Sequence, residues 1–291
     1  MKTKPTLCIY HGNCADGFGA AWAVWKKYPD IQFYAGVYGQ SAPDVRGHDV
    51  VMVDFSYPLA TMEKIIAAAA SVTVIDHHKT AAEDIQPLLN EGKIHGIFDM
   101  DHSGAILAWN WFHPNTNPPH LLQHIEDRDL WRFKLGYTKE IQAAVFSYPY
   151  DFEIWDWLMS YADDVDGHQS LVHQGRAITR KHEKDIAELV DVAKRPMNIS
   201  GHWVWCANLP YTMASDACHL MCTMPMYPKS SGELDTHPKF AVSYYDKLDW
   251  RVFSLRSIGE FDVSEIAKKY GGGGHKNAAG FTVPIGWEGE E

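Results

Sequence analysis

Three short apolar runs in the first third of the chain are separated by segments with helical spacing. The runs cover residues 7–10, 50–53 and 72–75. Each is brief and rich in Val, Ile or Leu, which is typical of buried strands. Residues 20–28 have helical spacing, and a second helix is expected from Pro58 to Ala70, with Ser56 as its cap. Strands that alternate with helices predict a parallel α/β sheet.

The middle and the end of the chain have a different pattern. Helices are expected at residues 104–112, 152–161, 174–193 and 262–270, and strands at 203–207, 240–245, 252–257 and 281–283. The strands at 240–245 and 252–257 are close enough to pair as a hairpin around residues 247–249. The charged helix at 174–193 has no proline until Pro196, and it is the expected connection between two domains.

Composition narrows the range of partners. The chain has 291 residues, of which 46% are hydrophobic, and a formal net charge of −11. An acidic protein is poorly suited to coating long nucleic acid, although bound cations can reverse the local field for a short nucleotide. Five cysteines without a CxxC pair indicate reduced thiols. Because residues 1–10 lack a signal-peptide core and no long apolar run follows, we expect a cytoplasmic protein with no membrane partner.

Polar side chains follow each of the first three predicted strands. His11 ends the first, Asp54 follows the second, and Asp76, His77 and His78 follow the third. The carboxyl ends of parallel strands share one edge of a sheet, where ligands bind in open α/β folds. Taken singly, each residue has an ordinary structural explanation. Asp54, for example, could cap a helix. Their common position favours one site.

Two further groups could join this site. His11, Cys14 and Asp16 form H-x-x-C-x-D, followed by glycines that permit a sharp turn. Asp127 and Asp129 flank Arg128, and in isolation they are equally typical of a charged surface.

Together these groups would crowd carboxylates into one pocket. The set is His11, Asp16, Asp54, Asp76, His77 and Asp127. Crowded carboxylates raise each other's pKa, and divalent cations remove that penalty. Mixed histidine and carboxylate ligands suit Mn²⁺, Fe²⁺, Zn²⁺ or Mg²⁺ better than Ca²⁺. Two such ions, about 3.5–4 Å apart, commonly hydrolyse phosphate esters.

Four consecutive glycines, Gly271–Gly274, follow the helix at 262–270. The run is no Walker loop, because GK[ST] is missing. Glycines expose backbone N–H groups that can cradle an anion, and His275 and Arg256 are nearby donors. The alternative is a helix C-cap, which needs only one glycine.

These motifs, in this order, resemble the DHH phosphoesterase superfamily, and in particular its oligonucleotide-exonuclease or nano-RNase-like branch with a GGGGH-type C-terminal domain. The matching segments are HGNCADG at 11–17, VDFS at 53–56, IDHH at 75–78, the Asp127 region, and RS at 256–257 followed by GGGGHKNAAG at 271–280. The resemblance implies a parallel-sheet catalytic domain (1–172), a helical linker (173–196) and a smaller α/β substrate-binding domain (197–291), with the active-site cleft between the domains.

The resemblance also implies roles for individual residues. His11, Asp16, Asp54, His77 and Asp127 would be metal ligands, with Asp129 as the alternative to Asp127 and with Asp54 bridging two ions, typically Mn²⁺. Cys14 stands where the family commonly has aspartate; a thiolate there could still bind a metal and would favour softer ions. Asp54, Asp76, His77 and His78 would form the catalytic centre, with His78 on the scissile phosphate. Substrate phosphates would be held by Ser103, Arg256, Gly273, Gly274 and His275.

The function expected from this resemblance is hydrolysis of phosphodiester bonds in short single-stranded oligonucleotides or linear dinucleotides by metal-activated water. A phosphatase acting on a bisphosphorylated nucleotide or pyrophosphate is the alternative within the same class. A nucleotide-binding protein with weakened catalysis is the alternative outside it, and Cys14 is the feature that supports it. The sequence does not show whether the substrate is RNA or DNA, or whether the protein is a monomer or a homodimer.

Overall fold

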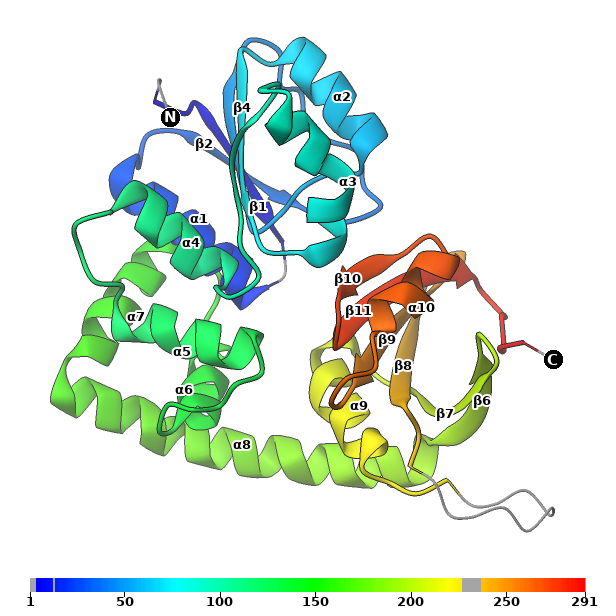
Figure 1. The fold of residues 1–291 in the computed structure, drawn as a ribbon. Coiled ribbons are helices and arrows are strands. Elements are labelled where there is room, and N and C mark those ends of the chain that lie inside the picture. Colours follow the sequence, from blue (N-terminus) through cyan, green and yellow to red (C-terminus); the bar gives the residue numbers. More distant parts are fainter. Residues whose placement is uncertain (1–3, 13, 227–236, 291) are drawn as a thin grey trace. The chain divides into compact units, whose positions relative to one another are not determined.

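The computed structural model describes residues 4–12, 14–226 and 237–290. The chain divides into two compact units, residues 1–180 and 181–291, each built around its own sheet (Figure 1). The predicted α/β class, with a parallel sheet and a second sheet, is confirmed. None of the helices in the described ranges combines the length and the apolar character needed to cross a membrane.

The first unit contains a five-stranded parallel sheet with strand order β2-β1-β3-β4-β5. The strands are β1 (Leu7–His11), β2 (Gln32–Gly36), β3 (Asp49–Val53), β4 (Ser71–Asp76) and β5 (His95–Phe98). The three predicted strands are the central ones. The two edge strands were not predicted, because they are only partly buried and lack a continuous apolar run.

Helices cover both faces of this sheet (Figure 1). One core includes side chains of α1 (Ala15–Lys27) and α4 (Gly104–Phe112), and the other includes side chains of α2 (Leu59–Ala68) and α3 (Lys79–Asn90). A sheet buried on both faces needs apolar side chains at consecutive positions, which explains the uninterrupted runs in β3 and β4.

Two helix starts differ from the prediction. Helix α1 begins at Ala15, and Gly17 lies inside its first turns, where an added Cβ would be 2.2 Å from the carbonyl oxygen of His11. This glycine therefore allows the helix to pack against the end of β1. Helix α2 begins at Leu59, and Ser56 does not cap it; instead the Ser56 hydroxyl donates to Oδ2 of Asp76 at 3.2 Å.

Four more helices complete this part of the chain: α5 (His120–Asp129), α6 (Thr138–Val145), α7 (Phe152–Asp163) and α8 (Val165–Ala193). Helix α8 has 29 residues, and the boundary between the units falls within it. It starts at Val165, earlier than the predicted Gln174, and Gly175 lies inside it. A Cβ at Gly175 would be 1.7 Å from the backbone oxygen of Glu140, so close packing, and not a helix end, explains this glycine.

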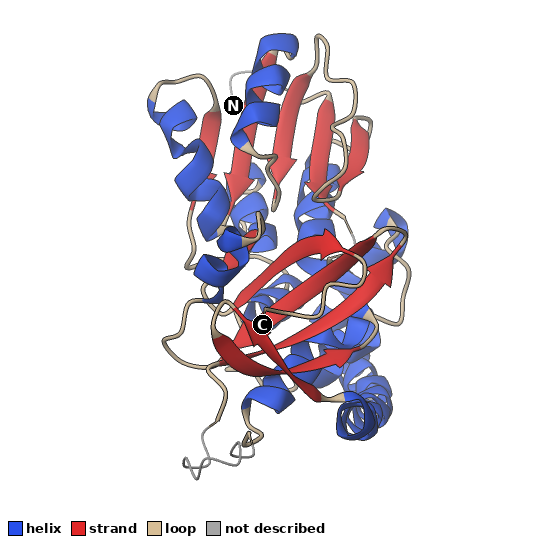
Figure 2. Cartoon of the chain, turned by 90° about the vertical axis from the view of Figure 1, so that its right-hand side faces the viewer, coloured by secondary structure: helices blue, strands red, loops and turns tan. Residues whose placement is uncertain are grey.

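The second unit contains a six-stranded sheet with order β10-β11-β9-β8-β7-β6, seen in Figure 2. Its strands are β6 (Arg195–Ile199), β7 (His202–Asn208), β8 (Phe240–Lys247), β9 (Trp250–Ser257), β10 (Gly273–His275) and β11 (Ala278–Pro284), and its helices are α9 (Ala214–Cys222) and α10 (Val263–Lys269), with a 3-10 turn at Tyr211–Met213. Among the strand pairs that the structure describes in this sheet, only β7–β8 is parallel. The predicted hairpin is present, with Lys247 paired to Trp250.

The glycine run is not an open loop. Gly271 follows α10 with φ +76°, whereas Gly273 and Gly274 belong to β10, which pairs with β11. A Cβ at Gly272 would lie 2.0 Å from the backbone oxygen of Gly280. Positive φ at Gly271 and Gly274 and close strand packing at Gly272 and Gly274 account for these three glycines.

Candidate metal centre

Four elements of the first unit bring polar side chains to one edge of the parallel sheet. His11 is the last residue of β1, Asp54 follows β3, Asp76 ends β4 and is followed by His77, and Asp16 lies in the first turn of α1. The strands are parallel and in register, so their carboxyl ends lie side by side. Topology therefore places these side chains together.

Asp54 lies at the centre of the group. It is 1% exposed and has φ +53°. Its Oδ1 lies 3.0 Å from Nε2 of His77, and its Oδ2 lies 3.5 Å from Nδ1 of His11. Neither carboxylate oxygen accepts a well-aligned hydrogen bond within the described residues. A buried carboxylate without such bonds is costly, so this position calls for a compensating positive charge.

Two groups of possible ligands adjoin Asp54. His11, Asp54 and His78 each have a ligand atom within 4.8 Å of the other two, and so do Asp16, His77 and Asp129. In the second group, Nε2 of His77 lies 3.5 Å from Asp16 and 3.6 Å from Asp129. Imidazole and carboxylate donors suit Mn²⁺, Fe²⁺ or Zn²⁺. The donor types and the unsatisfied carboxylate of Asp54 therefore fit divalent cations.

The N-terminus of α4 holds Asp16. The backbone N–H of Gly104 donates to Oδ2 at 2.6 Å, and that of Ala105 donates to Oδ1 at 3.0 Å. Burial and the nearby charges of Asp54 and Asp129 nevertheless raise the pKa of Asp16 well above its usual value. The cluster therefore carries more negative charge than its histidines balance, and a bound proton or a bound cation relieves it.

The histidines show the opposite effect of the same charges. Burial disfavours the charged form of His77, but Asp54 and Asp129 outweigh burial and raise its pKa well above the usual value. Burial also opposes ionisation of Asp54, yet His11 and His77 hold its pKa well below the usual range. Asp54 is thus the carboxylate most firmly kept ionised, as a metal ligand must be.

Asp76 is fully buried and orients the histidine pair. Its Oδ1 accepts hydrogen bonds from Nδ1 of His78 at 2.7 Å, from the N–H of His77 at 2.8 Å and from the N–H of His78 at 3.2 Å. The Ser56 hydroxyl donates to Oδ2, so both oxygens of this carboxylate accept hydrogen bonds. Asp76 therefore supports the residues around it.

The structure places only one of the two aspartates of α5 beside the cluster. Asp127 was the predicted ligand, but its Oδ1 accepts from the N–H of Lys134 at 2.8 Å, and its Oδ2 accepts from the N–H of Leu135 at 3.1 Å and from the hydroxyl of Thr138 at 2.6 Å. It is Asp129, 27% exposed, that faces His77. Residues two apart on a helix point about 200° apart, so only one of the two can reach the cluster.

Ser103 directly precedes α4, and its role in holding a substrate phosphate stays a prediction. The residue is fully buried, and its hydroxyl caps α4 by accepting from the N–H of Ile106 at 3.4 Å. Its own N–H donates to Oε2 of Glu126.

Cys14 directly precedes α1 and belongs to neither ligand group. Burial raises the pKa of its thiol, although His11 opposes the shift. A metal would therefore have to displace the thiol proton, and the role of Cys14 as a ligand stays a prediction.

The remaining predicted residues are in the second unit. Arg256, on β9, donates to Ser215 Oγ and to the backbone oxygen of Leu255, both at 2.8 Å. Gly273, Gly274 and His275 form β10. Their role in substrate binding also stays a prediction.

Sequence reasoning missed the aromatic rings beside the histidines. The ring of Tyr38 lies 5.3 Å from that of His11, and the ring of Phe55 stacks on His11 at 5.9 Å, measured between centroids. Phe55 directly follows Asp54 and could have been noticed for that reason. Tyr38 follows the edge strand β2, which the apolar pattern did not reveal.

Comparisons with known proteins agree with this fold. The family model of the DHHA1 domain matches residues 240–289. An uncharacterized protein of Acanthamoeba polyphaga mimivirus is 28% identical over 302 residues, covering 97% of this chain and 68% of the relative.

Two solved structures are similar at low identity. The DHH domain of a member of a family of ribosomal proteins is 14% identical, with a TM-score of 0.51 over 97% of this chain and 83% of that one. An exopolyphosphatase-related protein of Bacteroides fragilis is 13% identical, with a TM-score of 0.47 over 94% of this chain and 85% of that one. The family model thus identifies a DHHA1 domain at residues 240–289, and the likeness to the solved DHH domain shows a shared fold.

Proposed function

We propose that this chain is a metal-dependent phosphoesterase that hydrolyses phosphodiester bonds of short single-stranded oligonucleotides or linear dinucleotides. The observation that carries the proposal is Asp54, a buried carboxylate with one oxygen near His77 and the other near His11. A carboxylate between two ligand groups is what a two-metal phosphoesterase requires. The support for the DHH superfamily points to the same class of chemistry.

In this proposal His11 and Asp54, with Cys14 as a further ligand, would hold one ion, and Asp16, Asp54, His77 and Asp129 would hold the other. Mn²⁺ is the expected metal, and Fe²⁺, Zn²⁺ or Mg²⁺ would also suit these donors. When bound, the ions would lower the pKa of a water molecule and neutralise the phosphate.

The protein's own residues would align the substrate. Asp76 fixes the ring of His78 through Nδ1 and through two backbone N–H groups. We propose that His78, held in this way, donates a hydrogen bond to the phosphate under attack. A donor held in advance costs no reorganisation during the reaction.

A short substrate is favoured by charge. The net charge of −11 repels long polyanions, so binding must depend on local contacts. We propose that Arg256, Gly273, Gly274 and His275 of the DHHA1-containing unit bind phosphate groups of such a short substrate.

The two aspartates of α5 should separate in their effects. Asp129→Asn is expected to weaken Mn²⁺ binding about tenfold or more, because it removes a carboxylate ligand. Asp127→Asn is expected to leave the Mn²⁺ dissociation constant nearly unchanged but to lower the free energy of unfolding by about 1–3 kcal/mol, because the Lys134, Leu135 and Thr138 hydrogen bonds weaken. Calorimetric titration and urea unfolding measure the two quantities. The reverse pattern would show that Asp127 is the ligand.

The substrate is tested with a panel assayed in Mn²⁺, Mg²⁺, Zn²⁺ or no metal. The panel contains a linear dinucleotide, a pentanucleotide RNA, its DNA counterpart, a longer single strand, adenosine 3′,5′-bisphosphate and pyrophosphate. The proposal expects metal-dependent release of mononucleotides from the short chains. Cleavage of the bisphosphate or pyrophosphate alone would identify a small-molecule phosphatase. Nucleotide binding without turnover in any metal would refute an enzymatic role.

A further inference from the structure

The first turn of α4 is shared by two carboxylates from different elements. The first four N–H groups of a helix have no partner within the helix. Here Gly104 and Ala105 donate to Asp16, whereas Ser103 donates to Oε2 of Glu126 at 3.0 Å. The fourth N–H, that of Ile106, donates to the Ser103 hydroxyl. Side chains thus satisfy all four groups.

Glu126 is itself held in place. Its Oε1 accepts from Nη1 of Arg132 at 3.3 Å, and Nη2 of the same guanidinium donates to the backbone oxygen of Asp101 at 2.5 Å. Arg132 thereby ties the carboxylate to the segment that leads into α4. A planar guanidinium that makes both contacts restricts this segment more than either contact alone.

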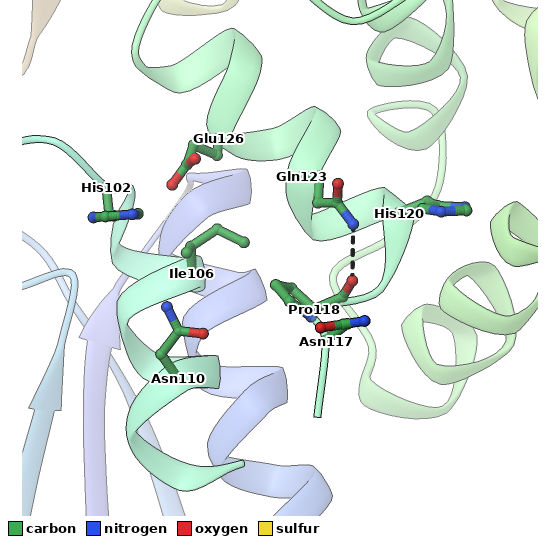
Figure 3. Close-up of a pocket in the computed structure, with 8 residues that line it drawn as sticks. All are labelled: His102, Ile106, Asn110, Asn117, Pro118, His120, Gln123 and Glu126. Carbon is green, nitrogen blue, oxygen red and sulfur yellow. Dashed lines mark hydrogen bonds between the residues drawn. The ribbon is translucent and has the colours of Figure 1, made fainter. Parts of the chain in front are cut away.

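Glu126 is not part of the metal cluster. It belongs to neither group of possible ligands, and its side chain is 17% exposed. It lines a pocket of about 550 Å³ between α4 and α5, together with His102, Ile106, Asn110, Asn117, Pro118, His120 and Gln123 (Figure 3). In that view Glu126 lies on α5, with His102 and Ile106 nearby on the α4 side. It therefore touches α4 from the side of the pocket.

We propose that Glu126 and Arg132 are positioning residues for the metal centre, acting through the N-terminus of α4 on Asp16. The inference rests on the proposed function, because it treats Asp16 as a metal ligand. The Asp16 carboxylate accepts hydrogen bonds from the backbone N–H groups of Gly104 and Ala105, the two residues directly after the one that Glu126 holds. A shift in this turn therefore moves the Asp16 carboxylate. Partners of this kind typically contribute about 10- to 100-fold in metal affinity.

The test compares two variants of Glu126. Leucine in Glu126→Leu cannot accept the hydrogen bond from the Ser103 N–H, whereas the amide oxygen of glutamine in Glu126→Gln still can. The matched control is Asn110→Ala, which changes the lining of the same pocket without touching the contacts of Ser103. Arg132→Gln is a second variant, in which Glu126 keeps its bond to Ser103. The readouts are the Mn²⁺ dissociation constant by calorimetry and the melting temperature of the metal-free full-length chain.

We expect Glu126→Leu to weaken Mn²⁺ binding about tenfold and Arg132→Gln to weaken it less. Glu126→Gln should restore most of the affinity, and Asn110→Ala should match the wild type. Equal Mn²⁺ affinity in Glu126→Leu and the wild type would overturn the inference. A loss of Mn²⁺ affinity in Glu126→Leu that is equally large in Glu126→Gln, with the melting temperature of both variants unchanged, would also overturn it. A wild type that binds Mn²⁺ but cleaves no phosphoester would refute the proposed function alone, since the affinity comparison still decides the role of Glu126.

Discussion

Replacing Asp54 by asparagine is expected to abolish phosphoester hydrolysis while leaving the fold intact. The buried carboxylate belongs to one ligand group and lies 3.0 Å from His77 of the other, and asparagine removes its negative charge without changing its size. Metal ions supply several kcal/mol of transition-state stabilisation, so kcat/KM should fall by about 10³-fold or more. The fold should tolerate the change, because asparagine readily adopts a positive φ such as the +53° of Asp54. Steady-state hydrolysis of a linear dinucleotide in Mn²⁺ measures the loss.

Asp44→Asn is the matched control for this experiment. Asp44 is 62% exposed and pairs with Arg46, so the same chemical change should leave kcat/KM unaltered. If Asp54→Asn kept its activity within about tenfold of the wild type, a difference of only about 1.4 kcal/mol, Asp54 would not be the central ligand.

A single methyl group at Gly104 should damage the site almost as severely. A Cβ at this position would lie 2.4 Å from Cβ of Asp54 and 2.6 Å from its Oδ1. Gly104→Ala must therefore push Asp54 away, and a displacement of about 1 Å can cost about 100-fold in rate. Alanine is a better helix former than glycine, so helix propensity cannot explain a loss. Both kcat/KM and the Mn²⁺ dissociation constant should be measured.

Gly136→Ala controls for the substitution itself. An added Cβ at Gly136 would meet no heavy atom within 4 Å. We expect Gly136→Ala to bind Mn²⁺ and turn over substrate as the wild type does. Wild-type activity in Gly104→Ala would mean that Asp54 can move without loss, which contradicts the account of a fixed bridging carboxylate.

The central strands and the strand-end residues could be predicted from the sequence for a physical reason. Strands covered on both faces must be apolar at consecutive positions, so β1, β3 and β4 are visible as uninterrupted runs. Because parallel strands bring their carboxyl ends to one edge, the strand-end residues His11, Asp54 and His77 were expected to meet.

Other features could not be read from the sequence, because tertiary packing decides them. The D-R-D pattern of α5 does not show which aspartate faces the sheet, because that depends on the rotation of the helix against its neighbours; the structure turns Asp129 toward His77. A serine before a helix suits both a cap and a phosphate ligand, and Ser103 is a buried cap. Edge strands and the three-residue β10 bury too little to leave an apolar pattern.

The measurement that tests the central claim most directly is hydrolysis of a linear dinucleotide by the full-length protein, first stripped of metal with a chelator and then titrated with Mn²⁺. The account predicts no turnover in the stripped protein, mononucleotide release that rises and saturates with Mn²⁺, and no such rise in Asp54→Asn. Turnover that persists without metal, or that is the same in Asp54→Asn, would contradict a metal centre built around Asp54.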